Sequence, residues 1–201
     1  MATKKRRASL YPETAEQDKS VPANSNEHVL ELPGIRRKVL GLSASGYRSD
    51  AVSIVCRQVM QPRGLIGLAK DTLDNSTSEM RELFDLLCDE STYPTVVHCT
   101  QGKDRTGLVI MLLLFLTNAV PLDDITADYS KSEAELIPEM EERMKEIRAI
   151  GLDEEYTKCP PGFIRAMKTY LDNKYGGVEG YLLSIGISRD KQEKVRSILL
   201  A

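Results

Sequence analysis

The most informative part of this sequence is TVVHCTQGKDRTG, which runs from residue 95 to residue 107. Thr95, Val96 and Val97 are β-branched, follow a proline and precede a glycine-containing loop, which is typical of a short buried strand in a parallel sheet. Residues 106–118 are mostly apolar and predict a buried helix. The pattern therefore predicts a strand–loop–helix unit, and with it an α/β domain whose small, largely parallel sheet is flanked by helices.

The loop of this unit has the composition of an anion-binding site. Its backbone N–H groups can converge on one centre, and the positive end of the following helix faces the same centre. Gly102 permits a tight backbone path that a side chain would obstruct. We expect the loop to bind a phosphate group. The residues expected to line this binding site are Thr100, Gln101, Gly102, Lys103, Thr106 and Gly107.

Cys99 and Arg105 stand at the two ends of the loop, with five residues between them. A thiol near a helix N-terminus and an arginine can have its pKa lowered from about 8.5 to roughly 3.5–7.5, so Cys99 is expected to be a thiolate nucleophile. Arg105 offers a planar set of donors that can bind two phosphoryl oxygens at once. Thr106 can donate its hydroxyl hydrogen to the sulfur. His98 is expected to shape the surroundings of Cys99 through hydrogen bonds to the backbone, and proton transfer is its alternative role.

Residues 98–107 resemble the signature loop of the cysteine-dependent protein tyrosine phosphatase superfamily. The GKDRTG ending is similar to the atypical branch found in bacteria and fungi, which includes tyrosine and lipid phosphatases. DYSKSE at residues 128–133 and YGGVEGYL at residues 175–182 agree with the same branch. The resemblance covers about residues 76–200 and implies a tyrosine-phosphatase-like fold.

This resemblance implies a phosphomonoester hydrolase that acts through a cysteinyl-phosphate intermediate. Phosphotyrosine proteins are the expected substrates, and phosphoinositides are the alternative. A catalytically impaired module that only binds phosphate is a second alternative. A sulfur- or arsenate-handling enzyme is a rival class, because it also uses a loop cysteine near an arginine.

Two positions compete for the general acid that protonates the leaving oxygen. In the branch that the sequence resembles, the aspartate inside the loop is the suspected acid, and Asp104 occupies that position. Many tyrosine phosphatases instead use an aspartate farther upstream, often beside Trp. This chain has no Trp, but it has Asp71 and Asp74 upstream of the loop. We favour Asp104 as the catalytic acid.

Two further residues are assigned from the same resemblance. Lys103 would add positive charge at the rim of the site and favour acidic substrates such as phosphoinositides, or it is simply a solvated lysine. Asp128 is expected to support the helix that follows the loop helix.

The sequence departs from the family pattern on its N-terminal side. The family carries an Asn-Phe-Arg-Asp-like segment and a strand that ends in Asp-Leu-Arg, and neither is present here. We therefore expect a tyrosine-phosphatase-like domain over residues 28–201 that lacks the first strands. Residues 1–27 are expected to form a disordered basic and polar tail.

Hydrophobic periodicity assigns most of the remaining chain to helices. Residues 76–88 begin with a capping-box pattern, Ser76 to Glu79, and predict an amphipathic helix. Residues 28–32 and 39–42 are predicted to be short strands. Further helices are predicted over residues 50–60, 122–135, 138–150, 162–174, 178–185 and 188–200.

The composition excludes several classes of protein. Lys and Arg number 27 against 30 Asp and Glu, and this net charge of -3 argues against a protein bound to nucleic acid by its overall charge. The longest apolar run, residues 108–116, is much shorter than the roughly 20 residues that cross a bilayer, so no stable membrane insertion is expected. No secretory signal pattern opens the chain, which predicts a cytoplasmic location, with a nuclear one as the alternative.

The cysteines and histidines give no sign of a metal site. Two histidines and four dispersed cysteines form no cluster with the spacing of ligands, so neither a metal nor another cofactor is expected. Cys56, Cys88 and Cys159 are expected to pack as free thiols.

Overall fold

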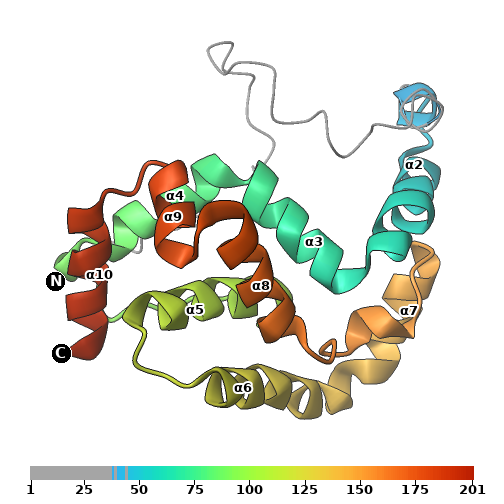
Figure 1. Cartoon of the computed structure of the whole chain (residues 1–201). Coiled ribbons are helices and arrows are strands. Elements are labelled where there is room, and N and C mark those ends of the chain that lie inside the picture. The colour runs from blue at the N-terminus through green and yellow to red at the C-terminus, as the bar shows by residue number, and fades with distance from the viewer. Residues whose placement is uncertain (1–37, 39, 44) are drawn as a thin grey trace, which may run out of the picture.

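The computed structural model describes residues 38, 40–43 and 45–201. In this part of the chain every regular element is a helix (Figure 1). The α-helices are α2 (Arg48–Val55), α3 (Gln61–Asn75), α4 (Thr77–Leu87), α5 (Asp104–Thr117), α6 (Leu122–Glu135), α7 (Met140–Ala149), α8 (Phe163–Tyr175), α9 (Val178–Ser184) and α10 (Arg189–Leu200). The shorter elements are the π-helical η2 (Cys56–Met60) and the 3₁₀ turns η3 (Glu90–Thr92), η4 (Ile137–Glu139) and η5 (Glu154–Thr157).

Helix α5 is the centre of the structure. Its sequence is apolar on all sides, which suits a helix that is surrounded by others rather than one with a solvent face. Helices α3, α6, α9 and α10 pack around it (Figure 1). Leu112 of α5 is fully buried together with Phe84, Met167 and Tyr181 from three other helices. Each such side chain contributes about 1.5–3 kcal/mol by leaving water, so the packing of α5 against its neighbours is a substantial part of the stability of the fold.

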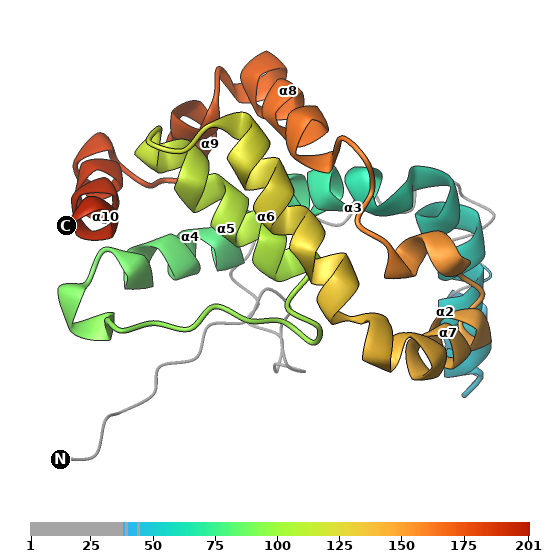
Figure 2. The ribbon, with the colours of Figure 1, turned by 90° about the horizontal axis from the view of Figure 1, so that it is seen from below.

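The predicted parallel sheet does not occur among the described residues, and the α/β assignment is wrong for this part of the chain. Residues 95–97 run without regular structure between η3 and α5 (Figure 2), and the side chain of Val96 is 83% exposed. β-branched residues favour an extended backbone, but a strand is stable only beside another strand that pairs with its backbone. Within residues 45–201 no segment provides that pairing.

The other two strand predictions have different outcomes. Residues 40–42 are helical, so the strand predicted for residues 39–42 is wrong there. Residues 28–32 lie outside the described residues, as does the tail predicted for residues 1–27.

The helix predictions are confirmed for most of the chain, with one helix missed. The segment that became α3 was given no element, because Pro62, Gly64 and Gly67 interrupt its first half. Gly64 has a φ of 61°, and this left-handed residue kinks the helix. Helix α4 begins after Ser76 as predicted, but the Ser76 side chain makes no capping hydrogen bond, so the capping box itself is not formed.

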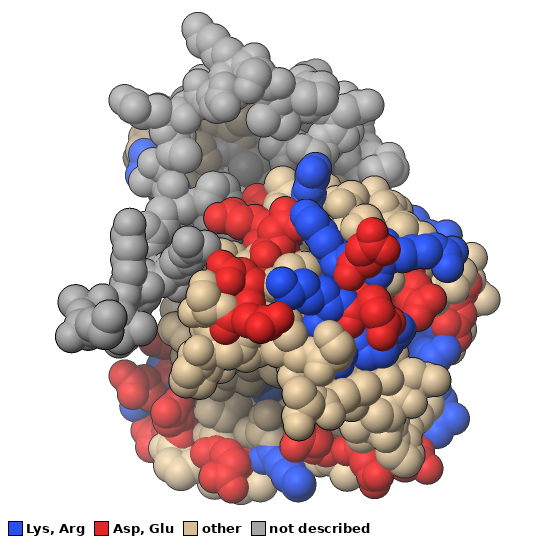
Figure 3. All heavy atoms as spheres, turned by 90° about the vertical axis from the view of Figure 1, so that its left-hand side faces the viewer, with Lys and Arg blue, Asp and Glu red and all other residues tan. Residues whose placement is uncertain are grey.

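One face of the molecule carries charges of both signs. Figure 3 shows Lys and Arg interleaved with Asp and Glu over α4, α9 and α10. Lys191 lies 2.6 Å from Asp85, and Arg196 lies 2.6 Å from Glu179. Exposed pairs of this kind contribute at most about 1 kcal/mol each, so this face adds little to stability. No helix in the described part combines the length and apolar character needed to span a bilayer.

We expect Gly180→Ala to destabilise the protein by about 3 kcal/mol, because it overpacks the junction of α8 and α9. A methyl group at Gly180 would lie 1.8 Å from the carbonyl oxygen of Tyr175, and a backbone oxygen cannot rotate away as a side chain can. Urea unfolding followed by circular dichroism measures the effect. Gly41→Ala is the matched control, because its added methyl group meets nothing within 4 Å. Equal midpoints for the two variants would contradict the close approach.

Candidate active site

The loop between Cys99 and Arg105, called the Cys–Arg loop below, leads directly into α5. Its last two residues, Asp104 and Arg105, are the first two of that helix. Gly102 has a φ of 69°, in the left-handed region that favours glycine, as the sequence predicts. The carbonyl of Lys103 accepts a hydrogen bond of 2.8 Å from the amide of Gly107, which starts the helix. The positive end of the α5 dipole therefore lies at the loop.

Cys99 is half-buried and surrounded by hydrogen-bond donors. Burial by itself raises the pKa of the thiol. The hydroxyl of Thr106 and the amides of Thr106, Gln101 and Gly102 outweigh burial and lower the pKa of Cys99 to about 7. The Thr106 oxygen is itself buried and has no other protein partner. About half of the Cys99 side chain is therefore thiolate at neutral pH.

We expect iodoacetamide to alkylate Cys99 at a rate that reaches half its maximum near pH 7, because only the thiolate reacts. Thr106→Val removes the hydroxyl donor and is expected to raise this midpoint by about one pH unit. Mass spectrometry of the peptide that contains Cys99 gives the rate at each pH.

The other cysteines are internal references for this experiment. Burial raises the pKa of Cys56, Cys88 and Cys159, and all of them are free thiols, as predicted. They should react more slowly than Cys99 at pH 7. A Cys99 rate that follows theirs at every pH would contradict the activated thiol.

Arg105 is held on the loop by Thr100. Its Nη2 donates a hydrogen bond of 3.0 Å to the Thr100 hydroxyl. This bond joins the residue next to Cys99 with the last residue of the loop. It restrains the position of the guanidinium relative to the loop.

Lys103 does not lie at the rim of the site. Its side chain is fully buried, and its Nζ donates to the carbonyls of Lys158, at 2.5 Å, and Tyr156, at 3.4 Å. It also lies 3.1 Å from Oδ1 of Asp104. These three oxygens compensate the buried charge. Both interpretations of the Lys103 side chain from the sequence, as a rim charge or as a solvated lysine, are therefore wrong.

A cavity of about 120 Å³ lies beside the loop, between α5, α6 and α8. Gly102 and Thr106 line it from the loop side, and Asp128 and Tyr129 line it from α6. Asp128 is exposed and stands next to the loop helix, where the sequence analysis expected a supporting residue. The Tyr129 ring leaves no room for a side chain at Gly107, since a methyl group there would lie 2.9 Å from the ring. Gly107 therefore allows α6 to approach the loop closely.

A cysteine with a lowered pKa, a left-handed glycine and an arginine on the first turn of a helix are thus arranged along seven residues. Residues 14–201 match the tyrosine phosphatase family. The chain belongs to this family. The match starts inside the segment that was predicted to be a tail.

Two curated proteins are similar to this member of the tyrosine phosphatase family. The chain is 33% identical over 125 residues to the triple specificity protein phosphatase PtpB of Mycobacterium tuberculosis. The aligned region covers 53% of this chain and 44% of PtpB. It is 30% identical over 135 residues to the tyrosine-protein phosphatase of Nostoc commune, which covers 62% of this chain and 45% of that protein. The matched part is less than half the length of each of these relatives.

The upstream aspartates of this phosphatase-family chain are engaged elsewhere. Asp71 pairs with Arg63 in the same helix. Asp74 accepts hydrogen bonds from Tyr170 and Tyr175, at 2.6–2.7 Å, and from Lys174 at 2.7 Å. Burial acts to raise the pKa of Asp74, but these three donors outweigh it and lower the pKa below its usual range.

His98 and Arg143 both contact the Cys–Arg loop. His98 is exposed, and its Nδ1 lies 3.2 Å from the carbonyl oxygen of Cys99, which suits the expected backbone contact. Arg143 of α7 was missed by the sequence analysis, although its side chain is buried and donates a hydrogen bond to Gln101. Its position, three residues after Met140 and four before Ile147, places it on the apolar side of that helix. This spacing was the feature of the sequence that could have indicated a buried Arg143.

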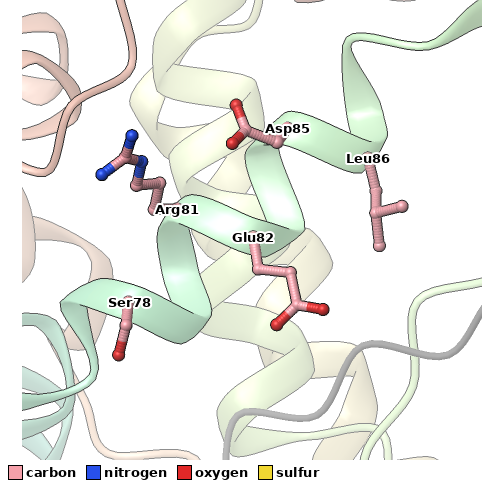
Figure 4. A pocket seen from close by; sticks show the side chains of 5 residues that line it. All are labelled: Ser78, Arg81, Glu82, Asp85 and Leu86. Carbon is pink, nitrogen blue, oxygen red and sulfur yellow. The ribbon is translucent and has the colours of Figure 1, made fainter. Parts of the chain in front are cut away.

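A hollow larger than the cavity beside the loop lies elsewhere in the described part of this phosphatase-family chain. It measures about 440 Å³ and is lined by Ser78, Arg81, Glu82, Asp85 and Leu86 (Figure 4). All of these residues belong to one helix, α4, and none belongs to the Cys–Arg loop. Size alone does not identify the reactive site here.

Proposed function

We propose that the chain hydrolyses phosphomonoesters through a cysteinyl-phosphate intermediate, with phosphotyrosine proteins as its substrates. The observation that carries this proposal is a thiol whose pKa is lowered to about 7, in a loop that ends with Arg105 at the start of α5. Membership of the tyrosine phosphatase family supports it. We place the activity in the cytoplasm, where a reactive thiol stays reduced.

The reaction proceeds in two steps. In the first, the Cys99 thiolate attacks phosphorus, and the bond between phosphorus and the phenolic oxygen breaks as an acid protonates that oxygen. Arg105 and the loop amides bind the three remaining phosphoryl oxygens while their charge redistributes. In the second, the carboxylate left by the acid takes a proton from a water molecule that attacks the cysteinyl phosphate, the sulfur–phosphorus bond breaks, and inorganic phosphate and the Cys99 thiolate are the products. The Thr106 hydroxyl stabilises that departing thiolate.

Asp104 is the general acid in this proposal. It belongs to the first turn of α5, directly before Arg105, and its side chain is 37% exposed. Its Oδ1 forms an ion pair with Nζ of Lys103, at a distance of 3.1 Å. Asp74 suits the role less, because its carboxylate is bonded to Tyr170, Lys174 and Tyr175 and does not belong to the Cys–Arg loop.

We expect Asp104→Asn to slow hydrolysis of a phenyl phosphate with a poor leaving group by about 100-fold or more. The effect on p-nitrophenyl phosphate should be much smaller, because that leaving group needs little protonation. Steady-state kinetics with a series of aryl phosphates measures the difference. Asp71→Asn is the matched control and should leave both rates near those of the unsubstituted chain. A larger leaving-group dependence in the control than in Asp104→Asn would place the acid upstream.

The choice of phosphotyrosine over phosphoinositides follows from Lys103. The lipid alternative depended on a lysine charge at the rim, and that charge is instead bonded to the carbonyls of Tyr156 and Lys158. The inert phosphate-binding module is disfavoured because a nucleophile and a candidate acid are both present in the loop.

Two measurements test the proposed function. A tyrosine-phosphorylated peptide with a ³²P label, quenched in acid during turnover, should leave the label on the peptide that contains Cys99. Initial rates with phosphotyrosine peptides should exceed those with phosphoinositide vesicles at equal phosphate concentration. Turnover without label on Cys99 would overturn the covalent mechanism, and faster release from the vesicles would overturn the substrate class.

A further inference from the structure

Arg143 is a buried charge that the proposed mechanism does not use. It lies in the middle of α7, and only 4% of it is exposed. Its Nη2 donates a hydrogen bond to Oε1 of Gln101 in the Cys–Arg loop. Its Nε and Nη1 are buried without a partner, and no carboxylate from residues 45–201 forms an ion pair with it. The contact with Gln101 is thus the one hydrogen bond of this guanidinium within the described part.

A guanidinium buried without a carboxylate is costly, because its lost hydration is not replaced by an opposite charge. Arginines in such positions are usually paired. Here the hydrogen bond goes to the loop that carries the nucleophile, and the amide of that same loop residue, Gln101, is one of the donors to the Cys99 sulfur. The side chain and the amide of Gln101 therefore connect α7 to the nucleophile.

Lys103 makes a reciprocal connection. Its side chain leaves the loop and donates to the carbonyls of Tyr156 and Lys158 at η5. Helix α7 packs against η5. Lys103 thus extends from the loop to η5, and Arg143 extends from α7 to the loop. These contacts hold the loop at Gln101 and at Lys103, the two residues that flank Gly102, whose φ is 69°.

We propose that Arg143 is a positioning residue of the phosphate site, which holds Gln101 so that its amide stays directed at the Cys99 sulfur and at the substrate's phosphoryl oxygens. The contact between the Gln101 amide and the substrate's phosphoryl oxygens rests on the proposed function. Arg143 does not touch the reacting atoms. The ionisable residues nearest to Cys99 in the sequence are His98, Lys103, Asp104 and Arg105, and the test leaves all four unchanged.

The test compares Arg143→Met, Gln101→Ala and the double variant. Arg148→Met is the matched control, because Arg148 is an exposed arginine of the same helix. The first readout is the pH midpoint of Cys99 alkylation by iodoacetamide, which a merely structural contact would not move. The second is kcat/KM for p-nitrophenyl phosphate, and circular dichroism shows whether each variant is folded.

We expect Arg143→Met to raise the alkylation midpoint by about half to one pH unit and to lower kcat/KM by about tenfold. Gln101→Ala should have the same effects, and the double variant should add nothing further, because one contact is removed in all three. Arg148→Met should change neither readout. An unchanged midpoint in folded Arg143→Met, or effects of Arg143→Met and Gln101→Ala that add, would overturn the proposal.

Two features keep this test decisive. If Arg143→Met does not fold, Gln101→Ala and Arg143→Lys decide instead, since the first leaves α7 intact and the second keeps the charge. A midpoint that stays unchanged in both would overturn the proposal. Alkylation needs no turnover, so an inactive chain with a raised midpoint in the variants would support Arg143 and refute the proposed function. An active chain with an unmoved midpoint would do the opposite.

Discussion

Replacing Cys99 by serine is expected to lower kcat for p-nitrophenyl phosphate by at least about 10,000-fold, the size of effect seen when a nucleophile is removed from a catalytic unit. The pKa of Cys99 is about 7, so much of the thiol is ionised at neutral pH, whereas a serine hydroxyl stays protonated. Inorganic phosphate should still bind, because Arg105 and the loop amides remain. Steady-state kinetics and isothermal titration calorimetry measure the two properties separately.

The pH dependence of the unsubstituted chain follows from the same ionisation. Below pH 7 the thiol is protonated, so kcat/KM should fall about tenfold for each pH unit once the pH is well below the pKa of about 7. Above pH 7 the thiolate predominates, and this limb should level off.

Cys88→Ser is the matched control for the loss of the nucleophile. Cys88 is a half-buried thiol at the end of α4, and burial raises its pKa. Its replacement should leave kcat within about twofold of the unsubstituted chain, since surface and peripheral changes rarely affect a distant site. A Cys99→Ser chain that keeps a tenth of the activity would refute attack by this sulfur.

Arg105→Lys is expected to lower kcat/KM by about 1,000-fold, although the positive charge is kept. A lysine is a single point charge and cannot bind two phosphoryl oxygens in one plane. It also cannot keep the hydrogen bond of 3.0 Å that joins Arg105 to Thr100 in the same geometry. Competition by inorganic phosphate should weaken in parallel.

Two further variants show which property of Arg105 matters. Thr100→Val removes the hydroxyl that holds the guanidinium and should cost about tenfold, as expected for a group that positions another. Arg165→Lys changes an exposed arginine that lies 3.5 Å from Asp123, far from the loop in sequence, and should have no effect. A substitution of Arg105 by lysine that costs less than tenfold would show that charge alone suffices.

The loop could be predicted as a candidate site from local properties, whereas the surrounding fold could not. Cys99, Gly102 and Arg105 could be assigned because their properties are local: a left-handed glycine, a helix that starts at the arginine, and donors within a few residues of the sulfur. The strand before the loop was predicted from an equally local preference for extended backbone. Its outcome depended on a distant partner strand, and local preference contains no information about that partner.

The roles of the charged residues were hardest to predict. Lys103 and Arg143 are both buried, although lysine and arginine are almost always exposed in globular proteins. Each is explained by a contact with a residue more than 40 positions away: Lys103 with Tyr156 and Lys158, and Arg143 with Gln101. Long-range contacts of this kind leave no periodic pattern in the sequence.

The position of α5 has a consequence for how the molecule should fail when it is heated. Cys99 lies just ahead of α5, a helix with six buried side chains, so the candidate site is coupled to the packing of the whole domain. Local unfolding should rarely expose Cys99 unless the whole domain unfolds. Heat inactivation should therefore coincide with overall melting, rather than precede it at a milder temperature.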